Sequence, residues 1–184
     1  FALAEACAER GAEVTLVAGP VSLKTHHPAI KRIDVESAGE MYQAAMTAFP
    51  SSDAAILCAA VADYRPENAS EQKIKRETER EMTLHLVPNP DIAASLGAIK
   101  REGQVMVGFA LETNDEATHA EGKLKRKNLD FIVLNSLRDQ GAGFRCDTNK
   151  ITIIDNAGGV TSYPLKTKRE VACDIVNKLV TLLK

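Results

Sequence analysis

The sequence predicts an α/β fold of the Rossmann-like, doubly wound kind: a mainly parallel sheet with helices on both faces and a C-terminal hairpin addition. Three observations support this prediction. Short apolar runs alternate along the chain with segments that have apolar residues at helical spacing. The run from Ala54 to Ala62 is apolar without a break, which is typical of a strand buried on both faces. Capping boxes (S/T-x-x-E) at Ser37, Thr113 and Thr167 mark helix starts.

Composition limits the classes of function. A chain of 184 residues is long enough for one domain with a full core, so we expect a single domain over residues 1–184. Its 23 basic and 25 acidic residues nearly balance, which argues against a nucleic-acid partner or a membrane surface. No apolar stretch reaches 18 residues, so no membrane span is predicted. The four cysteines are scattered without a C-x-x-C pair, and three of them lie in apolar or helical runs, which indicates reduced, buried thiols in a cytoplasmic protein.

The first half of the chain predicts two helices and three strands. The opening helix ends at Gly11, a glycine in the C-cap position. The helix that starts at Ser37 is closed by Pro50. The strands are predicted at 14–18, before a Gly-Pro turn, at 30–35, and at 53–62, which we expect to be the central strand.

The second half continues the alternation. MTLHLV at 82–87 alternates and predicts an edge strand, and a helix follows with Asn89 as N-cap, Pro90 at its first position and Asp91 in its first turn. The remaining elements are predicted as a strand at 104–109, a helix from Thr113 to about Lys127, a strand at 129–135, a hairpin around Asn156–Gly159, and a last helix capped by Thr167.

The first candidate site lies where the central apolar run ends. Asp63 follows that run directly, and the isolated cation Lys73 stands in the polar loop beyond it. Ligands of open α/β sheets bind outside the carboxyl ends of the strands, so this pairing suits an anionic ligand. The alternative is a crossover whose exposed end carries charge only because it is exposed.

A second candidate is the cationic end of the helix near residue 127. Lys123 and Lys127 share a helical face, and two further cations lie between them. The helix dipole favours one or two cations in a last turn. Four cations within the five residues 123–127 are more than the dipole explains. The pattern therefore indicates a polyphosphate site, with a solvated helix face as the alternative.

Two further segments can contact a nucleotide. Phe109 is placed at a strand end, where an aromatic ring can cover a base or ribose, although such residues also serve as core. Asn89, Pro90, Asp91 and Ile92 form a helix N-terminus with free amides, which can bind an anion or simply be capped.

Other motifs are weak or absent. Gly141-Ala142-Gly143 lacks the third glycine of a dinucleotide fingerprint, and no phosphate-binding P-loop motif occurs. The four histidines have no metal-ligand spacing. An NAD(P)-binding module or a non-catalytic nucleotide-binding regulator therefore remains an alternative, which the missing fingerprint disfavours.

Four separate motifs carry a family resemblance. AAVADYRP at 59–66 followed by KIK at 73–75, then NPDI at 89–92, VGFALET at 107–113 and K-x-x-x-KN at 123–128 occur in this order. With them the chain resembles bacterial phosphopantothenoylcysteine synthetase, a ligase of coenzyme A biosynthesis, from Phe1 to the last helix. The resemblance implies a Rossmann-like domain that forms a homodimer, with residues 73–90 near the dimer contact.

The resemblance also implies a reaction and its residues. The carboxylate of 4′-phosphopantothenate attacks CTP to give an acyl-cytidylate, and L-cysteine then displaces CMP. Lys73 resembles the family's mobile lysine for the first step, and Asp63 its ribose-side carboxylate. The residues that would contact the remaining ligand groups are Asn89, Pro90, Asp91, Ile92 and Phe109 for the nucleotide, Lys123 and Lys127 for the phosphates, and Ala59 and Ala60 for the acyl group. A divalent ion, Mg²⁺ or Mn²⁺, is implied; an ATP-using synthetase of the same family is the alternative.

The family pattern extends beyond the sequence. A strand, a glycine-rich loop and an asparagine that handles the acyl intermediate would stand ahead of Phe1 in the family. The family is commonly fused to a flavin-dependent decarboxylase, so we expect such a fusion in the full-length protein and no flavin in this chain.

Overall fold

The main sheet contains five strands in the order β10-β9-β7-β6-β3. In a computed structural model, the described residues are 1–68, 70, 72–73, 82–112, 116–136 and 147–183. Strands β3 (Ala54–Leu57), β6 (Val105–Glu112) and β7 (Phe131–Ser136) are parallel. Strands β9 (Ile151–Asp155) and β10 (Val160–Ser162) join β7 as the antiparallel hairpin predicted from the sequence. The α/β class with a mainly parallel sheet is thereby confirmed.

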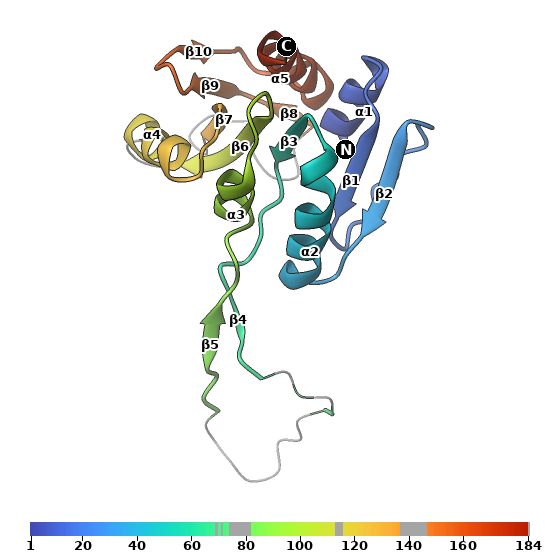
Figure 1. The fold of residues 1–184 in the computed structure, drawn as a ribbon, viewed down its shortest axis with the longest axis vertical. Coiled ribbons are helices and arrows are strands. Elements are labelled where there is room, and N and C mark those ends of the chain that lie inside the picture. The colour runs from blue at the N-terminus through green and yellow to red at the C-terminus, as the bar shows by residue number, and fades with distance from the viewer. Residues whose placement is uncertain (69, 71, 74–81, 113–115, 137–146, 184) are drawn as a thin grey trace.

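A second sheet pairs β1 (Val14–Ala18) in parallel with β2 (Ile30–Asp34). Two short antiparallel pairs complete the strands. One joins β8 (Thr148–Asn149) to β11 (Lys166–Thr167), and the other joins β4 (Tyr64–Pro66) to β5 (Leu86–Pro88). The β4–β5 pair forms an arm that extends away from both sheets (Figure 1).

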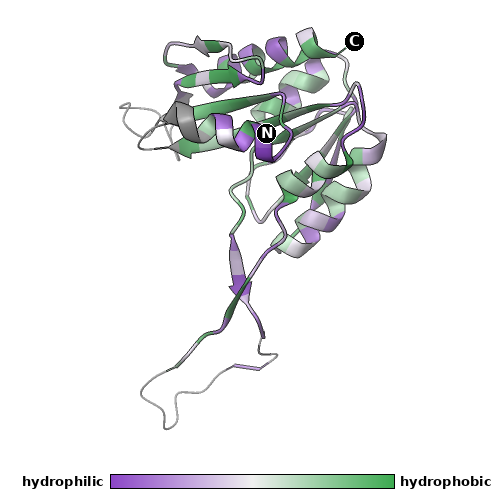
Figure 2. Ribbon diagram, turned by 60° about the vertical axis from the view of Figure 1, so that its left-hand side comes forward, coloured by the Kyte–Doolittle hydropathy of each residue, from purple (hydrophilic) through white to green (hydrophobic). Residues whose placement is uncertain are grey.

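Helices cover both faces of the main sheet. On one face, α2 (Ala38–Ala48), α3 (Ile92–Ile99) and α4 (Glu116–Arg126) enclose a core around Met106, Ile132 and Leu124. On the other face, α5 (Lys168–Leu182) covers Val107 and Phe131, and α1 (Ala2–Glu9) packs against α5 through a cluster of small and branched residues. The strands are hydrophobic and lie between helices with polar outer faces (Figure 2).

Local sequence signals explain several helix ends. Thr167 accepts a hydrogen bond from the Glu170 amide, and the Glu170 carboxylate accepts one from the Thr167 amide, so the last capping box is complete. At α2 only the serine half forms, because the Glu40 side chain accepts from the Glu36 amide instead. Gly11 ends the first helix at φ +87°, a backbone conformation that favours glycine. The predicted box at Thr113 falls outside the described side chains.

Several predictions were wrong in position or extent. The strand expected at 53–62 covers only Ala54–Leu57, and it ends the main sheet rather than lying at its centre. The edge strand expected at 82–87 is reduced to Leu86–Pro88. The N-cap of α3 is Asp91, not Asn89, because the Asp91 carboxylate accepts the bond from the Ala94 amide. Strand β6 continues past Phe109 to Glu112.

Candidate functional site

The site predicted from the sequence lies at the carboxyl ends of the parallel strands. After β3 the chain leaves the sheet at Cys58, and Ala59, Ala60 and Asp63 are exposed. Cys58 itself is exposed, which corrects the expectation of a buried thiol there. The strand stops because Leu57 is the last residue that pairs with β6. Small, solvent-facing side chains therefore border the sheet edge where Asp63 lies.

Asn89 ties the two ends of the arm together. Its backbone N–H donates to the Asp63 carbonyl at 2.8 Å, and its side-chain amide donates to the Ala62 carbonyl at 2.9 Å. Arg65 reinforces this contact by donating to the Pro88 carbonyl at 2.8 Å and to the Asn89 side-chain oxygen at 3.2 Å. The fold thus brings together two predicted segments, the loop at Asp63 and the start of α3, which are far apart in sequence.

Asp91 and Lys127 form an ion pair. The Lys127 Nζ lies 3.0 Å from the Asp91 carboxylate. Burial alone would raise the pKa of Asp91. The hydrogen bonds from the Ala94 amide and Lys127, with the charges of Lys127 and Arg126, nevertheless hold that pKa below its usual value. Asp91 therefore carries a negative charge that holds Lys127 beside the N-terminus of α3.

Close packing of α3 on the end of α4 sets this geometry. A Cβ added at Gly97 would lie 2.2 Å from the Lys127 carbonyl oxygen, so only glycine fits here. Asn128 donates from its side chain to the Gly97 carbonyl at 3.0 Å. The Lys127 amide also donates to the Lys123 carbonyl at 3.0 Å, which places both predicted lysines at the same end of α4.

The structure separates two other predicted residues from this group. Phe109 packs with the core on the α5 side of the sheet, whereas Ile92, next to Asp91, packs with the core on the α3–α4 side. Phe109 pairs with Val133 and is half-buried within β6. Lys73 is exposed in the connection between β4 and β5. Phe109 therefore packs on the face of the sheet opposite to α4.

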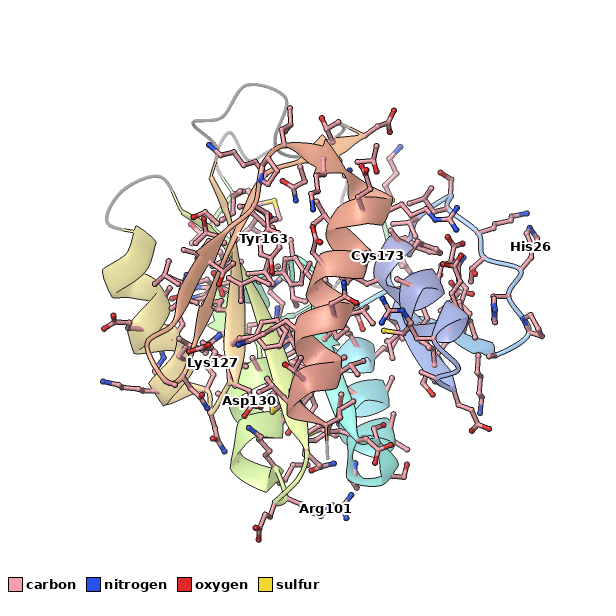
Figure 3. The ribbon with its side chains drawn as sticks, turned by 90° about the horizontal axis from the view of Figure 1, so that it is seen from above. His26, Arg101, Lys127, Asp130, Tyr163 and Cys173 are labelled. Atoms are coloured by element: carbon pink, nitrogen blue, oxygen red, sulfur yellow. The ribbon has the colours of Figure 1, made fainter. Side chains whose placement is uncertain are left out.

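Sequence reasoning missed two residues that organise this region. Arg65 was not assigned a role, although it lies within one of the motifs that carry the resemblance. Asp130 accepts hydrogen bonds from the Lys100 ammonium and the Met106 amide, each at 2.6 Å. Lys100 lies at the C-terminal end of α3, the end opposite to Asp91. Figure 3 shows Asp130 near Lys127. For Asp130, the signal available in the sequence was a carboxylate directly before a buried strand.

A surface hollow lies elsewhere, beyond the carboxyl ends of β1 and β2. Arg32 crosses it, donating to the Leu23 carbonyl at 2.6 Å and to Asp34 at 2.7 Å, and its guanidinium lies over the Phe1 ring. The hollow is lined by Val21, Ser22, Leu23, Lys24, Thr25, His26, Arg32 and Asp34. None of the predicted site residues lines it.

Neither a metal-binding cluster nor a membrane-spanning helix occurs within the described residues. No group of three or more His, Cys, Asp and Glu side chains lies close enough to hold a metal ion. In the same part of the chain, no helix has the length and apolar character needed to cross a membrane.

The fold and the cluster at the sheet edge define an α/β domain with a candidate anion-binding site. The sequence matches the family described as "DNA/pantothenate metabolism flavoprotein C-terminal domain" over residues 1–183. It is 34% identical to a solved structure of the C-terminal domain of coenzyme A biosynthesis bifunctional protein CoaBC. That match has a TM-score of 0.82 and covers 99% of this chain and 80% of the other. The chain therefore belongs to this family.

Curated relatives are longer proteins. The chain is 45% identical over 184 residues to CoaBC of Vibrio parahaemolyticus, covering 100% of this chain and 46% of that protein. It is 57% identical over 183 residues to a protein of an unknown prokaryotic organism named cysteine/cysteine sulfinic acid decarboxylase, covering 100% of this chain and 51% of that protein. The chain thus spans about half the length of the curated relatives it matches.

A more distant structure agrees in fold. The DNA/pantothenate metabolism flavoprotein from Streptococcus pneumoniae matches with a TM-score of 0.79 at 20% identity, covering 98% of this chain and 86% of the other.

Proposed function

We propose that this domain joins 4′-phosphopantothenate to L-cysteine, using CTP, as a phosphopantothenate–cysteine ligase of coenzyme A biosynthesis. Two facts support the proposal: family membership and the contact of Asn89 with Ala62 and Asp63. That contact carries the argument, because it gathers a carboxylate loop and a helix N-terminus at the sheet edge where α/β folds bind ligands.

The proposed reaction has two balanced steps. A carboxylate oxygen of 4′-phosphopantothenate attacks the α-phosphorus of CTP, and the bond from that phosphorus to the bridging oxygen breaks as pyrophosphate leaves. The amine of cysteine then attacks the acyl carbon of the acyl-cytidylate. CMP leaves with the bonding electrons, and the nitrogen loses a proton to form the amide.

The side chains take roles that match their positions. Asp63 would bind the ribose hydroxyls, and Ala59 and Ala60 would leave room for the acyl group because they are small and exposed. Lys127, with Lys123, would bind the phosphates. Since Lys127 already lies against Asp91, a phosphate must compete with that carboxylate for the lysine.

Lys73 would stabilise charge at the α-phosphate, which is the role of the family lysine that it resembles. Charge stabilisation of this kind is commonly the largest single contribution to catalysis of phosphoryl chemistry. Phe109 is half-buried and could offer only the edge of its ring to the nucleotide, so its contact would be secondary to those of Asp63 and Asn89.

A divalent ion, Mg²⁺ or Mn²⁺, would enter with the nucleotide. Mg²⁺ commonly uses one or two carboxylates together with substrate phosphates rather than a protein cage. The described residues fit this pattern, because Asp63 is an exposed carboxylate at the edge and no cage of three ligands lies there. The ion would neutralise triphosphate charge and so allow the substrate carboxylate to approach.

We further propose that the arm binds a second copy of this chain. A two-stranded ribbon is at best marginally stable alone. This arm also exposes large apolar side chains: Tyr64 is 61% exposed and Leu86 56%, and Leu84, just before β5, is 60% exposed. A homodimer through the arm would cover them. Light scattering should give a dimer for the native protein and a monomer for Tyr64→Ser/Leu86→Ser, while Val160→Ser, a change at a 63% exposed residue in β10, should stay dimeric.

The remaining proposals concern the whole protein. We propose a cytoplasmic enzyme in which this domain is fused to a flavin-dependent decarboxylase domain, since the chain matches about half of each longer relative. The flavin would belong to that other domain.

Calorimetry with CTP, ATP and NADH on the full-length protein tests the proposed function. Binding of CTP in preference to ATP, followed by pyrophosphate release when 4′-phosphopantothenate is added, is the expected result. Preference for ATP would assign the alternative synthetase type, and binding of NADH alone would overturn the ligase assignment.

A further inference from the structure

Helix α5 runs along the main sheet from the carboxyl ends of the strands to their amino ends (Figure 3). At the start of the helix, β11 pairs with β8, and the Asn149 side chain of β8 donates to Asn135, near the carboxyl end of β7, at 2.9 Å. Near the other end, Lys178 pairs with Asp155 at 2.8 Å, and Asp155 lies opposite Phe131, the first residue of β7. Strands β3, β6 and β7 are parallel, so their carboxyl ends share one edge. The first turn of α5 therefore lies at the edge of the sheet where β3 ends.

Three cations stand at the start of α5, and two of them are held by carboxylates. Lys166, just before the helix, pairs with Asp174 at 2.6 Å, and Arg169 pairs with Glu9 of α1 at 2.8 Å. Lys168, between them, is exposed, and its ammonium has no ion pair or hydrogen bond to any residue that the structure describes. Lys168 is therefore the cation of this group that a ligand can bind without displacing a carboxylate.

The position of Lys168 is unfavourable for a cation. The N-terminus of a helix carries a partial positive charge, so acidic residues are preferred in the first turn and a lysine is destabilised there. Helix α5 follows this preference with Glu170, whose side chain completes the capping box with Thr167. Residues that break such a local rule without a compensating contact are expected at functional sites. The lysine thus adds positive charge where the helix already favours an anion.

Two observations place Lys168 beside the end of β3. Ile56 of β3 packs against the core that α5 covers, which contains Val171 from the next turn of the helix. Cys58, the first residue after β3, is close enough to respond to the lysine: desolvation raises the pKa of the Cys58 thiol, and the positive charges of the amino terminus and Lys168 oppose that rise. The next residue is Ala59, one of the two small residues that we assign to the acyl group.

The proposed second step requires an anion to bind next to the acyl group. The amine of cysteine attacks the acyl carbon, and the carbon that bears this amine also bears the α-carboxylate. That carboxylate must therefore lie close to the acyl carbon when the amide bond forms. The phosphate of 4′-phosphopantothenate, by contrast, lies at the far end of the pantothenoyl chain. A cation beside Ala59 therefore suits the carboxylate of the amino acid.

We propose that Lys168 binds the α-carboxylate of L-cysteine in the second step and so selects an α-amino acid over a simple amine, a role that rests on the proposed ligase function. The contact is a charge-assisted hydrogen bond from the ammonium. Lys168 stands on the α5 face of the sheet, whereas Lys127 ends α4 on the other face. Cations on opposite faces then bind the cysteine carboxylate and the nucleotide phosphates, which keeps these negative charges apart.

Amine selectivity of the full-length protein tests the proposal. Cysteamine carries the amine and the thiol of cysteine but no carboxylate. In Lys168→Met, kcat/KM for L-cysteine should fall about 10-fold, the loss expected for one hydrogen bond to a charged group. The values for cysteamine, and the release of pyrophosphate from CTP and 4′-phosphopantothenate, should stay native. Lys168→Arg should keep most of the preference for L-cysteine over cysteamine. Arg169→Met, which removes the neighbouring cation, should keep all of it.

Four results would overturn the proposal. The first is a native kcat/KM for L-cysteine in Lys168→Met. The second is an equal loss with L-cysteine and cysteamine, which would mean that the lysine does not contact the carboxylate. The third is a higher KM for 4′-phosphopantothenate with an unchanged preference for L-cysteine, which would assign the lysine to that substrate instead. Absence of pyrophosphate release by the native protein would overturn the proposed ligase function, and the role of Lys168 with it.

Discussion

Asn89 and Asp63 are joined through the backbone, with the Asn89 N–H donating to the Asp63 carbonyl at 2.8 Å. The Asn89 side chain adds a bond to Ala62, and Arg65 adds one to Asn89. These hydrogen bonds hold the loop that follows β3 against the turn that precedes α3. Disturbing Asn89 should therefore disturb Asp63, although 26 positions separate them in sequence.

Asn89→Ala should weaken nucleotide binding and lower stability. The substitution removes the hydrogen bond to the Ala62 carbonyl, a loss of about 1 kcal/mol for a bond of this kind. Thermal unfolding and CTP calorimetry measure the two effects. Asn68→Ala, at an exposed position in the arm connection, is the control and should change neither. Unchanged CTP affinity in Asn89→Ala would exclude this residue from the site.

Lys73→Gln should block the first half-reaction in the full-length enzyme. Loss of one charge-stabilising donor typically costs about 3 to 4 kcal/mol in the barrier, or roughly 10²- to 10³-fold in rate. Pyrophosphate release from CTP and 4′-phosphopantothenate is the measurement. Lys31→Gln, an exposed lysine of β2, should retain the native rate. A native rate in Lys73→Gln would show that this lysine takes no part.

Lys127→Ala should weaken CTP binding far more than CMP binding, because only CTP carries the β- and γ-phosphates. Added salt should shrink the difference, since screening weakens partly exposed charge pairs. Calorimetry at two ionic strengths gives both comparisons. Equal losses for the two nucleotides would mean that Lys127 contacts neither terminal phosphate and serves only its pair with Asp91.

The pKa of Asp91 should rise in Lys127→Met. Burial already acts to raise the pKa, and the substitution removes the lysine hydrogen bond and charge that lower it, leaving only the Ala94 amide and the charge of Arg126 to lower it. A carboxyl whose pKa is depressed on folding stabilises the native state above its unfolded pKa and loses that contribution as the pH falls through its folded pKa. The native protein should therefore lose stability below about pH 3.8, the ordinary value, more steeply than Lys127→Met. Carboxyl NMR titration and acid unfolding report the two quantities; identical Asp91 titrations would refute the pairing.

Gly97→Ala should destabilise the domain and displace Lys127. The added Cβ would meet the Lys127 carbonyl oxygen at 2.2 Å, so α3 must move away from the end of α4. Overpacking of this kind costs about 1 to 3 kcal/mol. Gly122→Ala, in α4 with no atom within 4 Å of the new Cβ, is the matched control and should stabilise the helix by about 0.5 to 1 kcal/mol. Chemical unfolding of both variants provides the comparison, and equal stabilities would contradict the close approach.

The sequence alone determined the features that depend on neighbouring residues. The Thr167–Glu170 capping box, the glycine at the end of α1 and the β9–β10 hairpin follow from interactions within a few positions of the chain, so local patterns predict them. The alternation of apolar runs with helical segments likewise fixed the α/β class. The grouping of Asp63 with the start of α3 was available only through the family motifs.

Tertiary structure decided what depends on packing between distant segments. The apolar run after Asp53 predicted a long central strand, but a strand extends only as far as a neighbour pairs with it, and β6 pairs only with Ala54–Leu57. Which face Phe109 occupies follows from the register of β6 and β7. Asp91 serves both as the N-cap of α3 and as the partner of Lys127. Its second role depends on the close approach of Gly97 to Lys127 at the end of α4. These two residues are 30 positions apart in sequence, so no local pattern encodes their contact.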